Sequence, residues 1–129
     1  MTDEGRADVI AEELALGDAA LRAAEALAQL ALYHDALSRL YFAAFHWTRA
    51  LLASAGVETK THQGANSMLG VHFVRTGRVD AEHQRTLSRL ETWRGKADYT
   101  RGFVADATLV TAELDAARRL RQCVGALVA

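Results

Sequence analysis

The sequence predicts an all-α protein, folded as an up-and-down bundle of four to five helices. Half of the 129 residues are hydrophobic and 24% are charged, a composition typical of chains that fold around a core. Proline, the residue that helix interiors tolerate least, does not occur. Apolar residues recur at helical spacing along almost the whole chain, without a linker or a repeat. We therefore expect residues 1–129 to form a single domain.

Two long helices are predicted in the first part of the chain. The first spans about residues 8–30 and presents Leu14 and Leu21 to the core. The second spans about residues 33–55 and ends before Gly56, because glycine readily takes the left-handed conformation that closes many helices. The short connection between them favours an antiparallel pair.

Three further helices are predicted downstream, each started by a Thr or Asp side chain that caps free backbone N–H groups. They span about residues 61–77, 80–96 and 106–127, and their caps are Thr61, Asp80 and Asp106. The connections between these helices are also short, so neighbouring helices are expected to run antiparallel.

The second predicted helix is apolar on two sides. One stripe, which includes Leu37, Leu40 and Leu51, faces the core of the bundle. The opposite stripe carries few charges and consists of Asp35, Arg39, Phe42, Ala43, His46, Ala50 and Ala53. In a domain this small, a second buried face indicates contact with another molecule, and a twofold homodimer is the commonest solution. We therefore predict a homodimer formed through this helix.

Arg39 and His46 are the candidate catalytic residues on that opposite stripe. They are seven residues apart, which places them on the same side of a helix and about 10 Å apart along it. In a twofold dimer, Arg39 of one subunit would approach His46 of the other around a phosphate. Guanidinium binds phosphate oxygens and imidazole transfers protons near neutral pH, a combination that suits metal-free RNA cleavage. Asp35, one turn before Arg39, is expected to hold its guanidinium. The alternative is that Arg39 pairs with Asp35 for structural reasons alone and that His46 is a satisfied interface histidine.

Several segments together resemble the HEPN superfamily (higher eukaryotes and prokaryotes nucleotide-binding). Residues 35–46 read DALSRLYFAAFH and are followed by ALL at residues 50–52. Downstream, KTH at residues 60–62 and ADY at residues 97–99 agree with the same pattern. The similarity is greatest to stand-alone prokaryotic members and covers about residues 20–125.

The resemblance implies a bundle of four or five helices, usually dimeric. Many members pair with a minimal nucleotidyltransferase in toxin–antitoxin modules, and active members are metal-independent endoribonucleases with an Arg-x4–6-His motif. That motif falls on Arg39 and His46 in this sequence. Within the matched run, the supporting residues would be Asp35, Ser38 and Tyr41.

The residue after Arg39 differs from that of many active members, so a second function has to be considered. Ribonuclease-competent members often carry Asn, Asp or His there, whereas this chain has Leu40. The alternative is therefore a non-catalytic HEPN module that binds a nucleotide or a nucleotidyltransferase partner. A purely structural helical dimer is the third hypothesis.

Two further polar residues are possible phosphate contacts. Lys60 and His62 begin the third predicted helix, where free backbone N–H groups favour an anion, although capping and solvation explain them equally well. No metal site and no cofactor are expected, since the remaining histidines share no ligand spacing with acids or with the single cysteine; these residues are His34, His72, His83 and Cys123.

Charge and composition limit which partners and which cellular compartment the sequence favours. Residues 1–30 hold seven acidic and two basic residues, whereas the remainder is basic, with thirteen Lys and Arg against nine acids. The basic part is either a solvated surface or a weak footprint for a polyanion such as RNA. A single cysteine, no secretory leader and no apolar run of roughly 20 residues predict a cytoplasmic protein without a membrane span.

Overall fold

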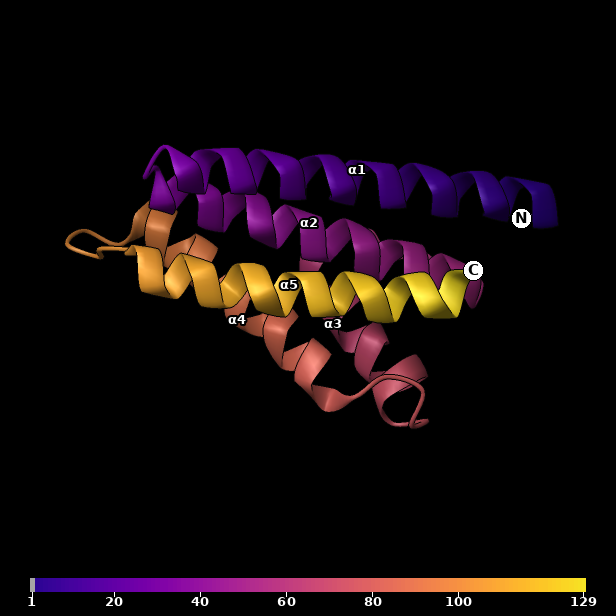
Figure 1. Ribbon diagram of the computed structural model, residues 1–129. Coiled ribbons are helices and arrows are strands. Elements are labelled where there is room, and N and C mark those ends of the chain that lie inside the picture. Colours follow the sequence, from indigo (N-terminus) through magenta and orange to yellow (C-terminus); the bar gives the residue numbers. More distant parts are fainter. Residues whose placement is uncertain (1) are drawn as a thin grey trace.

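A computed structural model describes residues 2–129, which form five α-helices and one π-helical turn, without a strand (Figure 1). The elements are α1 (Asp3–Gln29), α2 (Tyr33–Ser54), α3 (His62–Leu69), η1 (Gly70–Val74), α4 (Ala81–Tyr99) and α5 (Ala107–Val128). The predicted all-α class is therefore confirmed.

The second helix, α2, is the centre of the bundle. It runs antiparallel to α1, and α5 lies along it on another side, while α3 and α4 pack below (Figure 1). Leu37, Leu40 and Leu51 of α2 are fully buried, as predicted from their shared stripe. The helix that carries the candidate site is thus the one with the most neighbours, which makes it a rigid support.

The predicted caps are confirmed at three helix starts. Thr61 Oγ1 accepts a hydrogen bond from Gly64 N–H (2.9 Å), and Asp106 Oδ1 accepts one from Leu109 N–H (2.8 Å). Asp80 caps α4 in the same way, through Glu82 N–H. Each cap satisfies backbone donors that the first helical turn leaves without a partner.

Two predicted helix boundaries were wrong. The first helix starts at Asp3 rather than near residue 8, because Thr2 Oγ1 accepts a hydrogen bond from Gly5 N–H (3.0 Å) and caps it. The helix predicted over residues 61–77 is two elements, since the hydrogen bonds widen in η1, where Arg75 N–H donates to the carbonyl of Gly70 (2.9 Å).

The alanines of the opposite stripe of α2 are buried within the chain, where α1 packs on α2, whereas Asp35 and Arg39 are exposed and Phe42 and His46 are partly exposed. This corrects the expectation that the alanines are buried by a second molecule. Ala43 and Ala50 are fully buried within the chain, and Ala53 is 4% exposed. At Gly17 the two helices come so close that a Cβ atom would overlap the Trp47 indole ring. These alanines therefore need no second molecule to bury them, and dimerisation stays a prediction.

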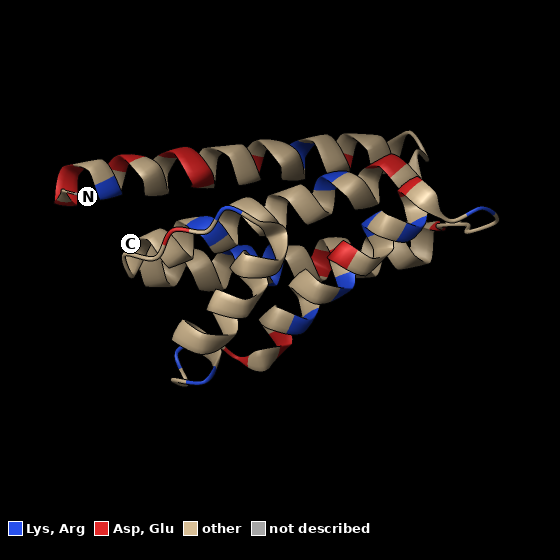
Figure 2. Ribbon diagram, turned by 180° about the vertical axis from the view of Figure 1, so that it is seen from behind, with Lys and Arg blue, Asp and Glu red and all other residues tan. Residues whose placement is uncertain are grey.

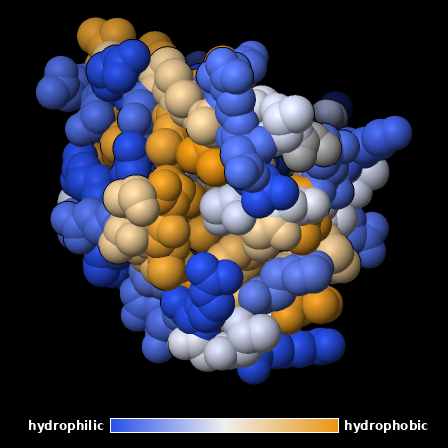
Figure 3. Space-filling view, turned by 90° about the vertical axis from the view of Figure 1, so that its right-hand side faces the viewer, coloured by the Kyte–Doolittle hydropathy of each residue, from blue (hydrophilic) through white to orange (hydrophobic). Residues whose placement is uncertain are grey.

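One end of the bundle carries an apolar groove. Apolar side chains lie among hydrophilic ones at the end of the bundle where α1 begins and α5 finishes (Figure 3). A groove there is lined mainly by Ala7, Ile10, Leu14 and Val128.

Within residues 2–129, every helix is too short or too polar to cross a lipid bilayer.

Shortening a core leucine of α2 should destabilise the fold. Leu40→Ala and Leu51→Ala are each expected to lower the free energy of unfolding by about 2–5 kcal/mol, because both side chains are fully buried. Chemical denaturation measures the change. The matched control is Leu30→Ala, at a position 69% exposed, which should change stability by no more than about 0.5 kcal/mol. Equal stability of all three variants would contradict this packing.

Candidate functional site

The candidate site lies along an edge of α2, beside the start of α3 and the middle of α4. The Phe45 ring of α2 lies 5.4 Å from the His46 ring and 4.4 Å from the His62 ring, between ring centroids. His46 and His62 are both partly exposed. Two histidines from different helices are thus gathered around one phenylalanine.

A buried glutamate of α1 orients His46. Glu13 Oε2 lies 2.7 Å from His46 Nδ1, and Glu13 is 8% exposed. The Arg49 guanidinium is a second partner, with its Nε 3.6 Å from Glu13 Oε1. An ionised carboxylate can only accept hydrogen bonds, so Nδ1–H of His46 donates to it. Nε2 of His46 is then left to take up or release a proton.

Glu13 was not predicted as a site residue, although the sequence around it holds a signal. Glu13 is followed at helical intervals by Gly17, Ala20 and Ala24, and all four residues are buried. An acid within a stripe of small buried residues is unusual, because a buried charge needs a partner. Here that partner is a histidine 33 residues away in the chain.

The second histidine is held by a tyrosine. Tyr41, which is 1% exposed, places its hydroxyl 2.6 Å from His62 Nδ1. Burial, and then the charge of Glu91, raises the pKa of Tyr41, so its hydroxyl stays protonated. Because a buried hydroxyl hydrogen needs an acceptor, we assign the Tyr41 hydroxyl as the donor and His62 Nδ1 as the acceptor. Burial lowers the pKa of His62, and the positive charge of Arg94 lowers it further. Neutral His62 therefore carries its hydrogen on Nε2, the opposite tautomer to His46.

Removal of the charge on Arg94 should raise the pKa of His62. A nearby cation disfavours the imidazolium form, so Arg94→Gln is expected to move the titration midpoint of His62 upward, towards the ordinary value of 6.5. The other charges that act on His62 remain in place: Glu91 raises its pKa, and His46 and Arg49 lower it. NMR titration of the imidazole signals measures the shift, and an unchanged midpoint would contradict the assigned cause.

Arg39 lies on the surface of α2, and its expected partner does not hold it. Its guanidinium carbon sits 4.8 Å from the centre of the Phe42 ring, towards the C-terminal end of the helix. Asp35 lies one turn in the other direction, and within residues 2–129 no ion pair joins it to Arg39. The predicted Asp35–Arg39 pair is therefore wrong, and the Arg39 guanidinium is available to an anion.

Three other sequence-predicted positions have different surroundings. Ser38 Oγ donates to Asp98 Oδ1 (3.1 Å), which ties α2 to α4 and keeps Ser38 apart from the histidines. Lys60 is exposed in the loop before α3 and lines a pocket that Glu13 and Arg49 also line. Leu40 is fully buried in the core, so the residue after Arg39 does not reach the site.

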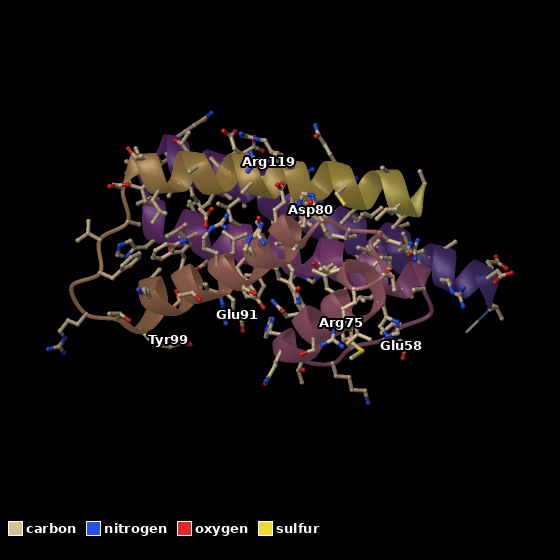
Figure 4. The ribbon with its side chains drawn as sticks, turned by 90° about the horizontal axis from the view of Figure 1, so that it is seen from below. Glu58, Arg75, Asp80, Glu91, Tyr99 and Arg119 are labelled. Atoms are coloured by element: carbon tan, nitrogen blue, oxygen red, sulfur yellow. The ribbon has the colours of Figure 1, made fainter. Side chains whose placement is uncertain are left out.

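Arg94 of α4 also belongs to this cluster; it agrees with the family pattern in the sequence, but spacing along the chain could not place it beside α2. Its guanidinium carbon lies 4.9 Å from the centre of the Tyr41 ring and 5.7 Å from that of Phe42. Its Nε atom is buried and has no hydrogen-bond partner. Figure 4 shows the bundle from below, with α3 and α4 side by side and Glu91 on α4.

The charge distribution in space follows the split seen in the sequence. Acidic residues gather on the N-terminal half of α1, whereas Lys and Arg are spread over the other helices (Figure 2). Within residues 2–129, no group of three or more His, Cys, Asp or Glu side chains is arranged to hold a metal ion. The ionisable groups of the site are the two histidines, Tyr41 and the neighbouring arginines, with Glu13 and Glu91 as acids.

A family model described as the HEPN domain matches residues 14–128. The chain belongs to the HEPN family. The match includes α2, α3 and α4, the helices that hold the two histidines and Arg94. The resemblance seen in the sequence is confirmed by this match.

Curated relatives of this HEPN protein come from archaea and bacteria. A protein of Methanocaldococcus jannaschii that carries the provisional name of a toxin is 39% identical over 80 residues, covering 62% of this chain and 60% of the relative. A UPF0332 protein of Gloeobacter violaceus is 38% identical over 79 residues, covering 61% and 63%. A second provisionally named toxin of Methanocaldococcus jannaschii is 32% identical over 79 residues, covering 61% and 54%. The matches thus span about six-tenths of the length of the first two relatives.

Proposed function

We propose that this HEPN protein is a metal-independent endoribonuclease, acting as a toxin or defence effector of a toxin–antitoxin module. The observation that carries the proposal is His46, whose Nδ1 is fixed by the buried Glu13 carboxylate at 2.7 Å while its Nε2 is left for proton transfer. An arginine without a carboxylate partner, Arg39, lies on the same helix. The toxin names of two relatives support the biological role.

The proposed reaction is transfer of a phosphate within the RNA chain. Nε2 of His46 takes the proton of a ribose 2′-hydroxyl, and that oxygen attacks the adjacent phosphorus. The bond from phosphorus to the 5′-oxygen breaks, and this oxygen receives a proton from a second histidine. Arg39 binds the non-bridging oxygens, where negative charge increases in the transition state. The products end in a 2′,3′-cyclic phosphate and a 5′-hydroxyl.

A homodimer completes the proposed site. Two copies that meet along the edge of α2 at Arg39, Phe42 and His46 would supply a base from one subunit and an acid from the other. Phe42 is half-buried in the single chain, so this edge offers apolar surface beside the charged groups. Sedimentation is expected to give about twice the mass of the 14.0 kDa chain.

Incubation of the purified protein with single-stranded RNA in EDTA tests the function. Cleavage should persist in the chelator, and the fragments should end in a 2′,3′-cyclic phosphate because the attacking oxygen belongs to the same strand. The control is the same RNA with 2′-O-methyl riboses, which lacks the nucleophile and should stay intact. Loss of cleavage in EDTA, or cleavage of the methylated RNA, would contradict this mechanism.

A non-catalytic module is the second candidate function. Arg39 and Arg94 have no carboxylate partner within residues 2–129, and two such guanidinium groups suit the phosphates of a nucleotide as well as those of RNA. In this case the protein would bind a nucleotide, or a nucleotidyltransferase antitoxin, and cut no RNA. Calorimetry with a nucleotide, combined with an absence of cleavage products, would select this function.

A further inference from the structure

We propose that Arg94 and His62 form a phosphate subsite for the RNA backbone, next to the Arg39–His46 site and within the same chain. This inference rests on the proposed function, because it takes single-stranded RNA as the ligand. It adds a second contact point on α3 and α4 to the residues of α2.

The placement of Arg94 is the first observation behind the subsite. Most arginines that contact a neighbouring helix have a carboxylate partner, as Arg89 has in Glu113 (2.8 Å) and Arg121 has in Asp18 (2.8 Å). Arg94 instead lies against the rings of Tyr41 and Phe42, and its buried Nε atom has no partner. Stacking on two aromatic rings holds the planar guanidinium group in place, so that its donors are ready for a planar or tetrahedral anion.

Phe42 links this arginine to the α2 site. Its ring centre is 4.8 Å from the guanidinium carbon of Arg39 and 5.7 Å from that of Arg94. Two like charges beside one ring repel each other, and within residues 2–129 neither forms an ion pair with a carboxylate, although the charge of Glu91 also acts on Tyr41 and His62 here. A polyanion is the ligand that relieves this repulsion, and RNA brings one phosphate after another along its strand.

His62 supplies the second donor of the subsite. Because Tyr41 O–H donates to its Nδ1 at 2.6 Å, neutral His62 has an N–H group at Nε2. Both groups lie beside the Tyr41 ring, with the guanidinium carbon of Arg94 4.9 Å and the His62 ring centre 5.2 Å from its centre. A neutral imidazole N–H and a guanidinium group can both donate to the oxygens of one phosphate.

Binding of an uncleavable RNA tests the subsite separately from cleavage. The probe is a fluorescently labelled single-stranded oligouridylate with 2′-O-methyl riboses, measured by anisotropy in EDTA over a range of salt concentrations. For the wild-type protein, log Kd should rise linearly with log salt. Arg94→Gln should weaken binding and reduce that slope by about 0.7, the value of one phosphate contact on a single strand.

The matched control is Arg85→Gln on the same helix. Arg85 is exposed and lies nine residues before Arg94, about half a turn around the helix from it, so its replacement should leave the slope unchanged. Melting curves check that each variant is folded. If Arg94→Gln does not fold, NMR of the wild-type protein replaces it, and the His62 ring signals should shift when the oligouridylate is added.

The outcomes separate this inference from the proposed function. Equal affinity and slope for Arg94→Gln and Arg85→Gln, or unshifted His62 signals, would overturn the subsite while cleavage by His46 could still be observed. Arg94-dependent binding without any cleavage of ordinary RNA would support the subsite and count against the ribonuclease. Uridine 5′-monophosphate that binds as tightly as the oligonucleotide, also through Arg94, would overturn RNA as the ligand.

Discussion

Replacement of His46 by glutamine is expected to slow RNA cleavage by about 10²–10⁴-fold, the usual contribution of a proton-transfer group. Glutamine can still donate a hydrogen bond to Glu13, but it cannot take a proton from a ribose hydroxyl. The loss should therefore appear in the rate of the chemical step. Single-turnover cleavage of labelled RNA, with protein in excess, measures that rate.

The choice of glutamine matters because Glu13 is buried. His46→Ala would leave the Glu13 carboxylate with Arg49 alone, and a buried charge that loses a partner lowers stability. A slow alanine variant could then be slow because it is partly unfolded. The melting temperature of His46→Gln should stay near the wild-type value. Cleavage by a folded His46→Gln variant at the wild-type rate would exclude His46 as the base.

The helices were predictable because their signals are local. Periodic leucines define the core stripe of α2, and the caps Thr61, Asp80 and Asp106 are each bonded to N–H groups two or three residues away. Such contacts depend only on the residues within one turn. The same reasoning failed where a cap stood outside the apolar pattern, as Thr2 does at the start of α1.

The helix partners could not be predicted in the same way. The alanines opposite the core stripe indicated a second buried face, but only the fold shows that α1 covers them at Ala43 and Ala50. Alanine and glycine suit a close helix–helix contact within one chain as well as a contact between chains. In the structure, a Cβ atom at Gly17 would overlap Trp47 of the same chain, so this close contact is one between α1 and α2 and not between two subunits.

The candidate site was predictable only where its residues lie on one helix. Arg39 and His46 share one helix, so their spacing alone places them together. The partners that determine their chemistry come from elsewhere: Glu13 is 33 residues from His46, and Arg94 is on α4. The orientation of the Arg39 side chain could not be predicted from the sequence pattern, because a surface arginine can turn towards Asp35 or towards Phe42. In the structure it lies over the Phe42 ring.

Replacement of Arg39 by lysine should reduce the rate of cleavage by about 10²–10³-fold, similar to the loss of one donor to a developing oxyanion. Lysine keeps the positive charge but presents a point charge instead of a planar fork, and it gives up the stacked position over Phe42. Since Arg39 is exposed and forms no ion pair within residues 2–129, its replacement should change stability by no more than about 0.5 kcal/mol.

Arg85→Lys, on a face of α4 away from the site, is the control for this substitution and should cleave at the wild-type rate. The two variants carry the same net charge, so a difference between them reports the geometry of the guanidinium rather than general attraction of RNA. The binding data separate the steps further. If Arg39 acts in the transition state, Arg39→Lys lowers kcat while the affinity for uncleavable RNA changes little. If Arg39→Lys instead weakened the binding of uncleavable RNA and left kcat unchanged, Arg39 would be a residue that only binds RNA. His46 would then lack its proposed electrostatic partner.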